Sequence, residues 1–328
     1  QGLNGTEIAI SESQERMAVV VRPEDVDTFV VECNKENIDA VVVATVTKKP
    51  NLVMHWNGET IVDLERSFLD TNGVRVVVDA KVVDKDVKLP EERTTSADTL
   101  EADTLTVLSD LNHASQKGLQ TIFDCSVGRS TVNHPLGGRY QLTPTEASVQ
   151  KLPVQHGVTH TASVIAQGFN PYIAEWSPYH GAAYAVIEAT ARLVAAGANW
   201  SKARFSYQEY FERMDKQAEC FGQPVAALLG SIESQIQLGL PSIGGKDSMS
   251  GTFEELTVPP TLVAFGVTTA DSRKVLSPEF KAVGENIYYI SGQVLSAEID
   301  FALIKKNFAQ FEALQKAHKV TSASAVKY

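Results

Sequence analysis

Residues 241–251 read Pro-Ser-Ile-Gly-Gly-Lys-Asp-Ser-Met-Ser-Gly, and the chemistry of this run guides the interpretation of the whole chain. Gly244 and Gly245 can adopt positive φ and let backbone N–H groups approach an anion. Lys246 adds a positive charge, and Asp247 with the hydroxyls that follow it can orient Mg²⁺. The run therefore predicts a site for a phosphate and a metal ion.

The run is not a Walker A loop, because Leu240 stands where that motif needs its first glycine and Asp247 stands where it needs Ser or Thr. An alternative interpretation is a glycine-rich connection from a helix to a strand, with Ser248 and Ser250 simply solvated. The residues of this run alone leave both interpretations open.

The composition is that of a globular protein. The chain has 328 residues, 43% of them hydrophobic, which is enough for a substantial core and suggests roughly two domains of α/β or α+β type. Lys and Arg number 29 against 40 Asp and Glu, so the net charge of −11 argues against a nucleic-acid binder. No apolar run is long enough to span a bilayer. We expect a soluble, cytoplasmic protein with no membrane partner.

The cysteines support a reducing compartment. Cys33, Cys125 and Cys220 are odd in number and widely spaced, without a CxxC pair, which argues against a disulfide framework and against a structural zinc site.

Hydrophobic periodicity predicts a first module at residues 1–68 and a second from about 105 to 271. In the first module we expect a helix at 23–35, and a hairpin at the Asn57-Gly58 turn. Its expected strands are 7–10, 16–21, 39–46, 51–56 and 59–62. The charged, hydroxyl-rich stretch 84–105 reads as a linker.

In the second module the pattern predicts helices at 182–198 and 207–220 and a strand at 262–268. An incomplete third unit follows, with an amphipathic helix at 299–317 and a strand at 320–328. Because the chain starts at Gln1 and this last unit stops early, we expect a piece of a longer protein.

Two groups of polar residues are further candidates. Glu12, Ser13 and Gln14 interrupt a strand pattern and offer donors and acceptors for an amide or for ribose hydroxyls, although a surface turn would look the same. Glu188 lies in an apolar helix, where a carboxylate needs a metal or a partner, and Arg192 four residues later predicts an ion pair.

Histidines near these residues have simpler interpretations. We expect His156 and His160 to be structural or exposed, and Ser177 and His180 to serve the N-terminus of the helix at 182–198.

Taken in order, three runs resemble formylglycinamide ribonucleotide amidotransferase, also called phosphoribosylformylglycinamidine synthase. They are Ser11-Glu12-Ser13-Gln14-Glu15-Arg16-Met17, Val127-Gly128-Arg129-Ser130 and Gly244-Gly245-Lys246-Asp247-Ser248-Met249-Ser250. The resemblance covers essentially the whole chain. Residues 205–211 are similar to the large, single-chain bacterial form of this enzyme.

The resemblance implies an α+β fold built from PurM-like (AIR synthetase-like) A and B domains. Residues 1–83 would be the later part of a first B domain, 84–104 a linker, 105–277 a second A domain, and 278–328 the opening of a second B domain. In this family two A domains pair through their sheets, so a partner domain is expected to be missing and two copies of the chain could pair instead.

The resemblance also implies a reaction. Members of the family use ATP and Mg²⁺ to activate the amide of formylglycinamide ribonucleotide, and ammonia from glutamine then gives the amidine. Glu12, Ser13, Gln14 and Ser248 would hold the substrate, and Gly244, Gly245, Lys246 and Asp247 would approach the nucleotide phosphates. The catalytic residues and the glutaminase cysteine belong to other domains, so none is assigned here and the chain alone is expected to be inactive.

One departure from the family concerns a metal. Some large-form enzymes bind an auxiliary nucleotide through Mg²⁺ held by an Asp, a Glu and an Asn, whose counterparts here are His156, Glu188 and Arg192. Only the glutamate is kept, so Glu188 is a weakened metal candidate and no tightly bound nucleotide is expected. The alternatives are another PurM-like enzyme, whose N-terminal ATP motifs the sequence lacks, or a non-catalytic binding or scaffolding module.

Overall fold

The computed structural model describes residues 2–11, 15–71, 73, 75–83, 96–123, 125–214, 217–290, 292 and 295–327. The chain divides into a first unit, Gln1–Val77, and a second unit, Val78–Tyr328. The domain boundaries expected from the sequence remain predictions, and helix α4 begins at Leu100, inside the stretch predicted as a linker.

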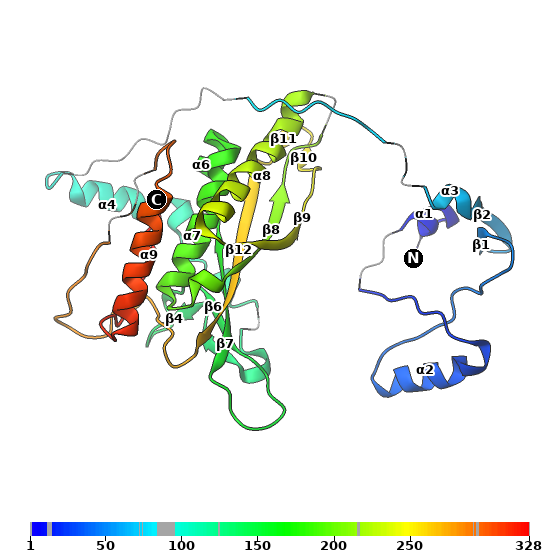
Figure 1. Ribbon diagram of the computed structural model, residues 1–328, viewed down its shortest axis with the longest axis horizontal. Helices are drawn as coiled ribbons and strands as arrows, with labels where there is room; N and C mark the ends of the chain where they lie inside the picture. The colour runs from blue at the N-terminus through cyan, green and yellow to red at the C-terminus, as the bar shows by residue number, and fades with distance from the viewer. Residues whose placement is uncertain are drawn as a thin grey trace. The chain divides into compact units, whose positions relative to one another are not determined.

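The first unit is small (Figure 1). Its hairpin turns at Asn57-Gly58, as predicted, because both residues adopt positive φ, 49° and 86°. Its elements are α1 (Gly5–Ile10), η1 (Pro23–Asp25), α2 (Val26–Lys35), β1 (Asn51–Trp56), β2 (Glu59–Glu65) and α3 (Arg66–Leu69).

The prediction of a strand at residues 7–10 was wrong, because this stretch is helix α1. The Asn4 side chain accepts the backbone N–H of Glu7 at 2.9 Å, and the Glu7 carboxylate accepts the backbone N–H of Asn4 at 2.8 Å. This reciprocal capping box satisfies two donors that a helix start leaves open. The strands predicted at 16–21 and 39–46 were also wrong, since neither stretch pairs with a neighbouring strand.

The second unit contains a six-stranded sheet in the order β3-β6-β7-β12-β8-β9. Neighbouring strands are antiparallel except β8 and β9, which are parallel and connected through α8. The sheet strands are β3 (Thr131–Asn133), β6 (Ser148–Lys151), β7 (Thr161–Gly168), β8 (Arg204–Tyr210), β9 (Ser242–Lys246) and β12 (Thr261–Asp271). The helices are α4 (Leu100–Ser109), α5 (Lys117–Gln120), α6 (Pro171–Trp176), α7 (Pro178–Ala195), α8 (Ala218–Leu238) and α9 (Phe301–Lys316). Shorter elements are η2 (Leu111–His113), η3 (Val127–Arg129), η4 (Trp200–Lys202), β4 (Leu136–Gly137), β5 (Thr143–Pro144), β10 (Thr252–Phe253) and β11 (Leu256–Thr257).

In the part of the chain that the structure describes, the long helices α7 and α8 pack on one face of this sheet. On β7 the residues Ala162, Val164 and Ala166 are buried, whereas Ile165 on the opposite face is 42% exposed. Helix α7 lies so close to the covered face that a Cβ on Gly168 would stand 2.1 Å from the carbonyl oxygen of Ala185. The mixed sheet with helices on one side confirms the predicted α+β class.

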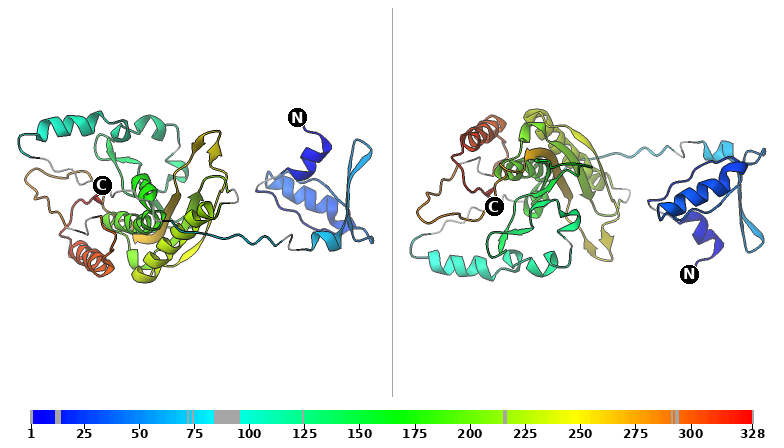
Figure 2. Two further views of the ribbon diagram at one scale, coloured as in Figure 1. Left: turned by 90° about the horizontal axis from the view of Figure 1, so that it is seen from above. Right: turned by 90° about the horizontal axis from the view of Figure 1, so that it is seen from below.

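Helix α9 completes the core (Figure 2). It matches the predicted helix at 299–317, and it packs against α7 and α8. The ring of its Phe308 meets Trp200 at 5.4 Å between centroids. Residues 320–327, predicted as a strand, form none, because they have no strand neighbour.

The helix predicted at 207–220 was wrong. Residues 204–210 are strand β8, with Phe205, Tyr207 and Glu209 buried in strict alternation, and the helix begins only at Ala218. The other long helix matches better, since α7 covers most of 182–198, and Ser177 caps it as expected by accepting the His180 N–H. Across the described residues, no helix combines the length and the apolar character needed to cross a bilayer.

Candidate functional site

The glycine-rich run forms the outer edge of the sheet. Gly244, Gly245 and Lys246 lie in β9, all exposed, and β9 has β8 as its one neighbour in the sheet. Gly244 has a φ of 142°, in a region that favours glycine. A Cβ on Gly245 would stand 2.5 Å from the backbone oxygen of Tyr207, so only glycine allows β9 to lie this close to β8.

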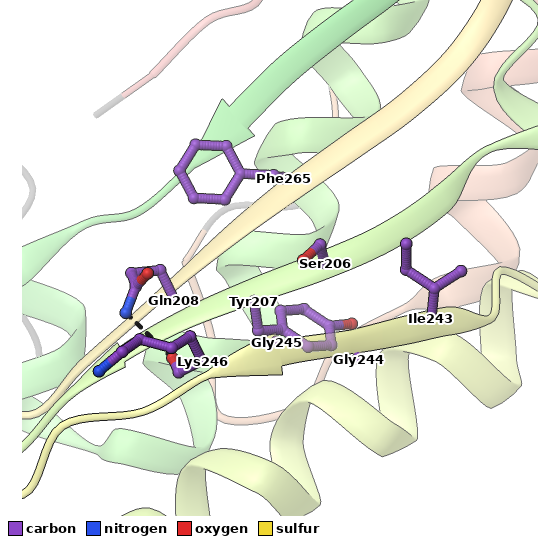
Figure 3. Close-up of a pocket in the computed structure, with 8 residues that line it drawn as sticks. All are labelled: Ser206, Tyr207, Gln208, Ile243, Gly244, Gly245, Lys246 and Phe265. Carbon is purple, nitrogen blue, oxygen red and sulfur yellow. Dashed lines mark hydrogen bonds between the residues drawn. The ribbon is translucent and has the colours of Figure 1, made fainter. Parts of the chain in front are cut away.

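A hollow of about 360 Å³ lies along this edge, on the sheet face that the helices leave open (Figure 3). The strand register explains which side chains reach it: Phe265 pairs with Ser206 and Ser206 with Gly244, while Gln208 pairs with Lys246. The lining residues are Ser206, Tyr207, Gln208, Ile243, Gly244, Gly245, Lys246 and Phe265. Gln208 Nε2 donates to the Lys246 carbonyl oxygen at 3.0 Å.

The lining residues therefore combine a cation, amide and hydroxyl groups, two glycines and two aromatic residues. Sequence reasoning did not select Ser206, Gln208 or Phe265. Aromatic and polar residues alternate at 205–208, which was a usable signal for Ser206 and Gln208, because a strand would place both on one face.

The residues after β9 are fixed to the end of β8. Ser248 N–H donates to the Glu209 carbonyl oxygen at 3.0 Å, and the Phe211 N–H donates to the Ser248 carbonyl oxygen at 2.9 Å. The Ser248 and Ser250 hydroxyls lie 3.3 Å apart. The structure thus brings Gly244 to Ser248 together on one exposed edge.

Besides Asp247 in the loop after β9, a second carboxyl group, that of Glu209, lies near this loop. Glu209 is 8% exposed, and burial, followed by the charge of Asp247, raises its pKa above the ordinary range. The buried Tyr207 hydroxyl beside it has its pKa raised by burial and by the charge of Glu209. A buried carboxyl group thus lies within reach of the charge of Asp247, in the loop that follows the candidate anion site.

We expect Glu209 to make folding pH-dependent. The folded chain holds the Glu209 proton more tightly than the unfolded chain, so the free energy of unfolding falls as pH rises from the unfolded pKa to the folded one. Glu209→Gln should remove this decline in urea unfolding measured between pH 4 and 8. Glu255→Gln, at an exposed glutamate between β10 and β11, should keep it. Identical pH profiles for both variants would contradict this assignment.

The other predicted substrate residues, Glu12, Ser13 and Gln14, lie outside the described residues. Ser11 before them ends α1, and its hydroxyl donates to the Ile8 carbonyl oxygen at 2.9 Å. This stretch belongs to the first unit, and the β9 edge belongs to the second.

The predicted ion pair in α7 is confirmed. Arg192 Nη2 lies 2.7 Å from Glu188 Oε1, and Glu188 Oε2 accepts the Phe169 N–H at 3.2 Å. Arg192 Nε lies 4.0 Å from a second carboxylate, Glu146, which is nearly fully buried. Lys327 Nζ approaches Glu146 Oε2 at 3.5 Å, and the Ser324 hydroxyl donates to Glu146 Oε1 at 2.5 Å.

These contacts give Glu188 a cation from the protein itself. His156 lies exposed in the loop between β6 and β7. No group of three or more His, Cys, Asp or Glu suited to a metal ion occurs among the described residues. The assignment of Glu188 as a metal ligand remains a prediction, and its bonds to Arg192 and to Phe169 favour the ion-pair interpretation.

Comparisons with known proteins agree with the resemblance. The AIR synthase related protein C-terminal domain family matches residues 1–57. The chain is 28% identical over 291 residues to phosphoribosylformylglycinamidine synthase subunit PurL of Thermococcus sibiricus, covering 87% of this chain and 37% of that protein. It is 29% identical over 297 residues to the same subunit of Streptomyces coelicolor, covering 88% and 37%. The chain thus spans just over a third of the length of these curated relatives.

Solved structures show the same fold. PurL of Thermotoga maritima complexed with ATP superposes with a TM-score of 0.59 at 18% identity, over 96% of this chain and 46% of that one. PurLQS from the same organism gives 0.59 at 20% identity, over 85% and 42%. The PurM-like fold and the predicted resemblance to phosphoribosylformylglycinamidine synthase are confirmed.

Proposed function

We propose that this chain forms part of the synthetase region of a phosphoribosylformylglycinamidine synthase, a carbon–nitrogen ligase of purine biosynthesis that takes its amide nitrogen from glutamine. The similarity to PurL along 87% of the chain supports this assignment. Among the structural observations, the β9 edge supports it most directly. There two glycines and Lys246 border an open hollow, an arrangement suited to the phosphates of a nucleotide or a nucleotide-like substrate.

The residues of this edge fit a phosphate. Backbone N–H groups of Gly244 and Gly245 can approach its oxygens because no Cβ intervenes. Lys246 adds a positive charge, and in the structure its Nζ donates to the Asp247 carbonyl oxygen at 2.9 Å. The Ser248 hydroxyl would contact the substrate. When bound, ATP with Mg²⁺ would phosphorylate the amide oxygen that ammonia then displaces.

The metal fits less well than the phosphate. Among the described residues, Asp247 is the one carboxylate in the exposed loop itself, and Glu209 near it is buried, with its pKa raised by burial and by the charge of Asp247. A Mg²⁺ ion at this edge would therefore take most of its ligands from phosphate oxygens and water, as Mg²⁺ commonly does.

The chain would need other domains for activity. By the resemblance, the general base, most metal carboxylates and the glutaminase lie elsewhere, and Glu12, Ser13 and Gln14 would complete the substrate site.

The open sheet face, with Ile165 42% and Val267 38% exposed, would be covered by a homologous A domain or by a second copy of the chain. Sedimentation velocity of the chain alone tests the second arrangement, and a monomer at high micromolar concentration would exclude it. We place the assembled enzyme in the cytoplasm.

Titration calorimetry with ATP and Mg²⁺ tests the nucleotide assignment. We expect weak binding to the wild-type chain and an affinity about tenfold lower for Lys246→Met, as for the loss of one charge-assisted hydrogen bond. Lys202→Met, at an exposed lysine in η4, is the matched control and should bind like the wild type. Binding unaffected by Lys246→Met would remove this edge from the site. A chain that binds neither ATP nor the substrate would instead support the scaffolding alternative.

A further inference from the structure

A cysteine and a histidine face each other away from the β9 edge. Cys125 Sγ lies 3.3 Å from His134 Nδ1, and both residues are half-buried. Neither side chain borders the hollow, and neither has a role in the proposed function. With the ring proton on Nε2, Nδ1 is the acceptor for the thiol proton.

The backbone on both sides of the pair is fixed. The Thr131 hydroxyl donates to the Cys125 carbonyl oxygen at 2.6 Å, and the Thr145 hydroxyl donates to the His134 carbonyl oxygen at 2.9 Å. Between the two residues the chain turns through Gly128 and enters β3, which pairs with β6. The thiol and the imidazole are therefore held in contact by the sheet.

The other two cysteines lie in different surroundings. Cys220 is buried in α8 at 9% exposure, and Cys33 is half-buried within α2 of the first unit. Cys33 therefore resembles Cys125 in exposure but lies within a regular helix. The three thiols of one chain provide an internal comparison.

We propose that Cys125 is a nucleophilic thiol with His134 as its general base, and that this pair is a site of covalent modification by small disulfides. As Cys125 Sγ attacks a disulfide, its proton moves to His134 Nδ1 and the S–S bond of the reagent breaks. A mixed disulfide remains on Cys125. The departing sulfur takes the proton from the imidazole, so no other reactant is needed.

Competitive alkylation of the full chain tests the reactivity. The chain is treated with iodoacetamide, and the rate at each cysteine is read from its own peptide by mass spectrometry. We expect Cys125 to react at least about tenfold faster than Cys33 in the folded chain, because a positioned base accelerates proton transfer. In guanidinium the two rates should converge. Equal rates in the folded chain would overturn the proposal.

A variant of His134 distinguishes activation of Cys125 by a general base from simple solvent exposure of its thiol. His134→Gln should reduce the rate at Cys125 to that at Cys33, whereas His156→Gln, at an exposed histidine, should leave it unchanged. Oxidised glutathione then serves as the disulfide, and the mixed disulfide should form first at Cys125. An unchanged rate in a folded His134→Gln chain would exclude the general base. If that variant does not fold, the comparison of folded and unfolded wild-type chains decides the question.

Discussion

Replacing Arg192 by methionine should lower the free energy of unfolding by about 3 kcal/mol, the lower end of what removing one partner of a buried ion pair costs. Arg192 is 18% exposed and Glu188 15%, while Glu146 is only 4% exposed in its side chain. Methionine keeps the aliphatic stem but leaves both carboxylates without this cation. Urea unfolding at pH 7, followed by circular dichroism, measures the loss.

An exposed arginine provides the control. Arg273 contacts Asp271 through the same kind of short bond but is 63% exposed, so Arg273→Met should lower the free energy of unfolding far less than Arg192→Met does. A second comparison is Glu188→Gln combined with Arg192→Met, which should recover part of the loss because one buried charge disappears. Similar losses for Arg192→Met and Arg273→Met would show that burial does not determine how much the Arg192–Glu188 pair contributes to the free energy of unfolding.

Elements with strong local signals could be predicted from the sequence. The helix at 182–198 has a capping serine and an apolar face, the hairpin has Asn57-Gly58, and the strand at 262–268 follows two prolines. These signals lie within a few residues of the elements they specify. Their prediction therefore needed no knowledge of the neighbours in space.

Elements that depend on distant partners were harder to predict. Residues 207–220 contain both a strand end and a helix start, and β8 is a strand because β12 and β9 pair with it on its two sides. The reverse holds at residues 39–46, where a run of valines finds no strand to pair with. Apolar character alone does not decide between these outcomes.

The same distinction applies to the candidate site. Gly244, Gly245 and Lys246 were predicted because they are adjacent in the sequence. Phe265 and Ser206 reach the same hollow only because β12 lies between β7 and β8, an order that no local pattern reveals. The buried Glu209 next to Asp247 likewise depends on how the loop after β9 folds back onto β8.

Gly245→Ala should damage both the sheet edge and the site. The new Cβ would stand 2.5 Å from the Tyr207 carbonyl oxygen and 3.1 Å from its carbonyl carbon, and neither backbone atom can rotate away. Strand β9 must then separate from β8, which moves Lys246 away from Gln208. We expect a loss of about 2–3 kcal/mol in the free energy of unfolding, as for an overpacked site, and ATP affinity lowered by more than the tenfold effect of Lys246→Met.

A second Gly→Ala substitution, at a glycine with open space around it, is the control for this clash. It shows whether alanine is tolerated where no backbone atom stands in its way. A Cβ on Gly118, in α5, meets no atom within 4 Å, so Gly118→Ala should leave ATP binding unchanged and stability unchanged or slightly higher. Unfolding in urea and ATP calorimetry on the same two variants give both quantities. If Gly245→Ala lost stability but kept the wild-type ATP affinity, the pairing of β9 with β8 would be structural and the nucleotide phosphates would bind elsewhere. Loss of both together would tie the phosphate site to the close approach that only a glycine at position 245 permits.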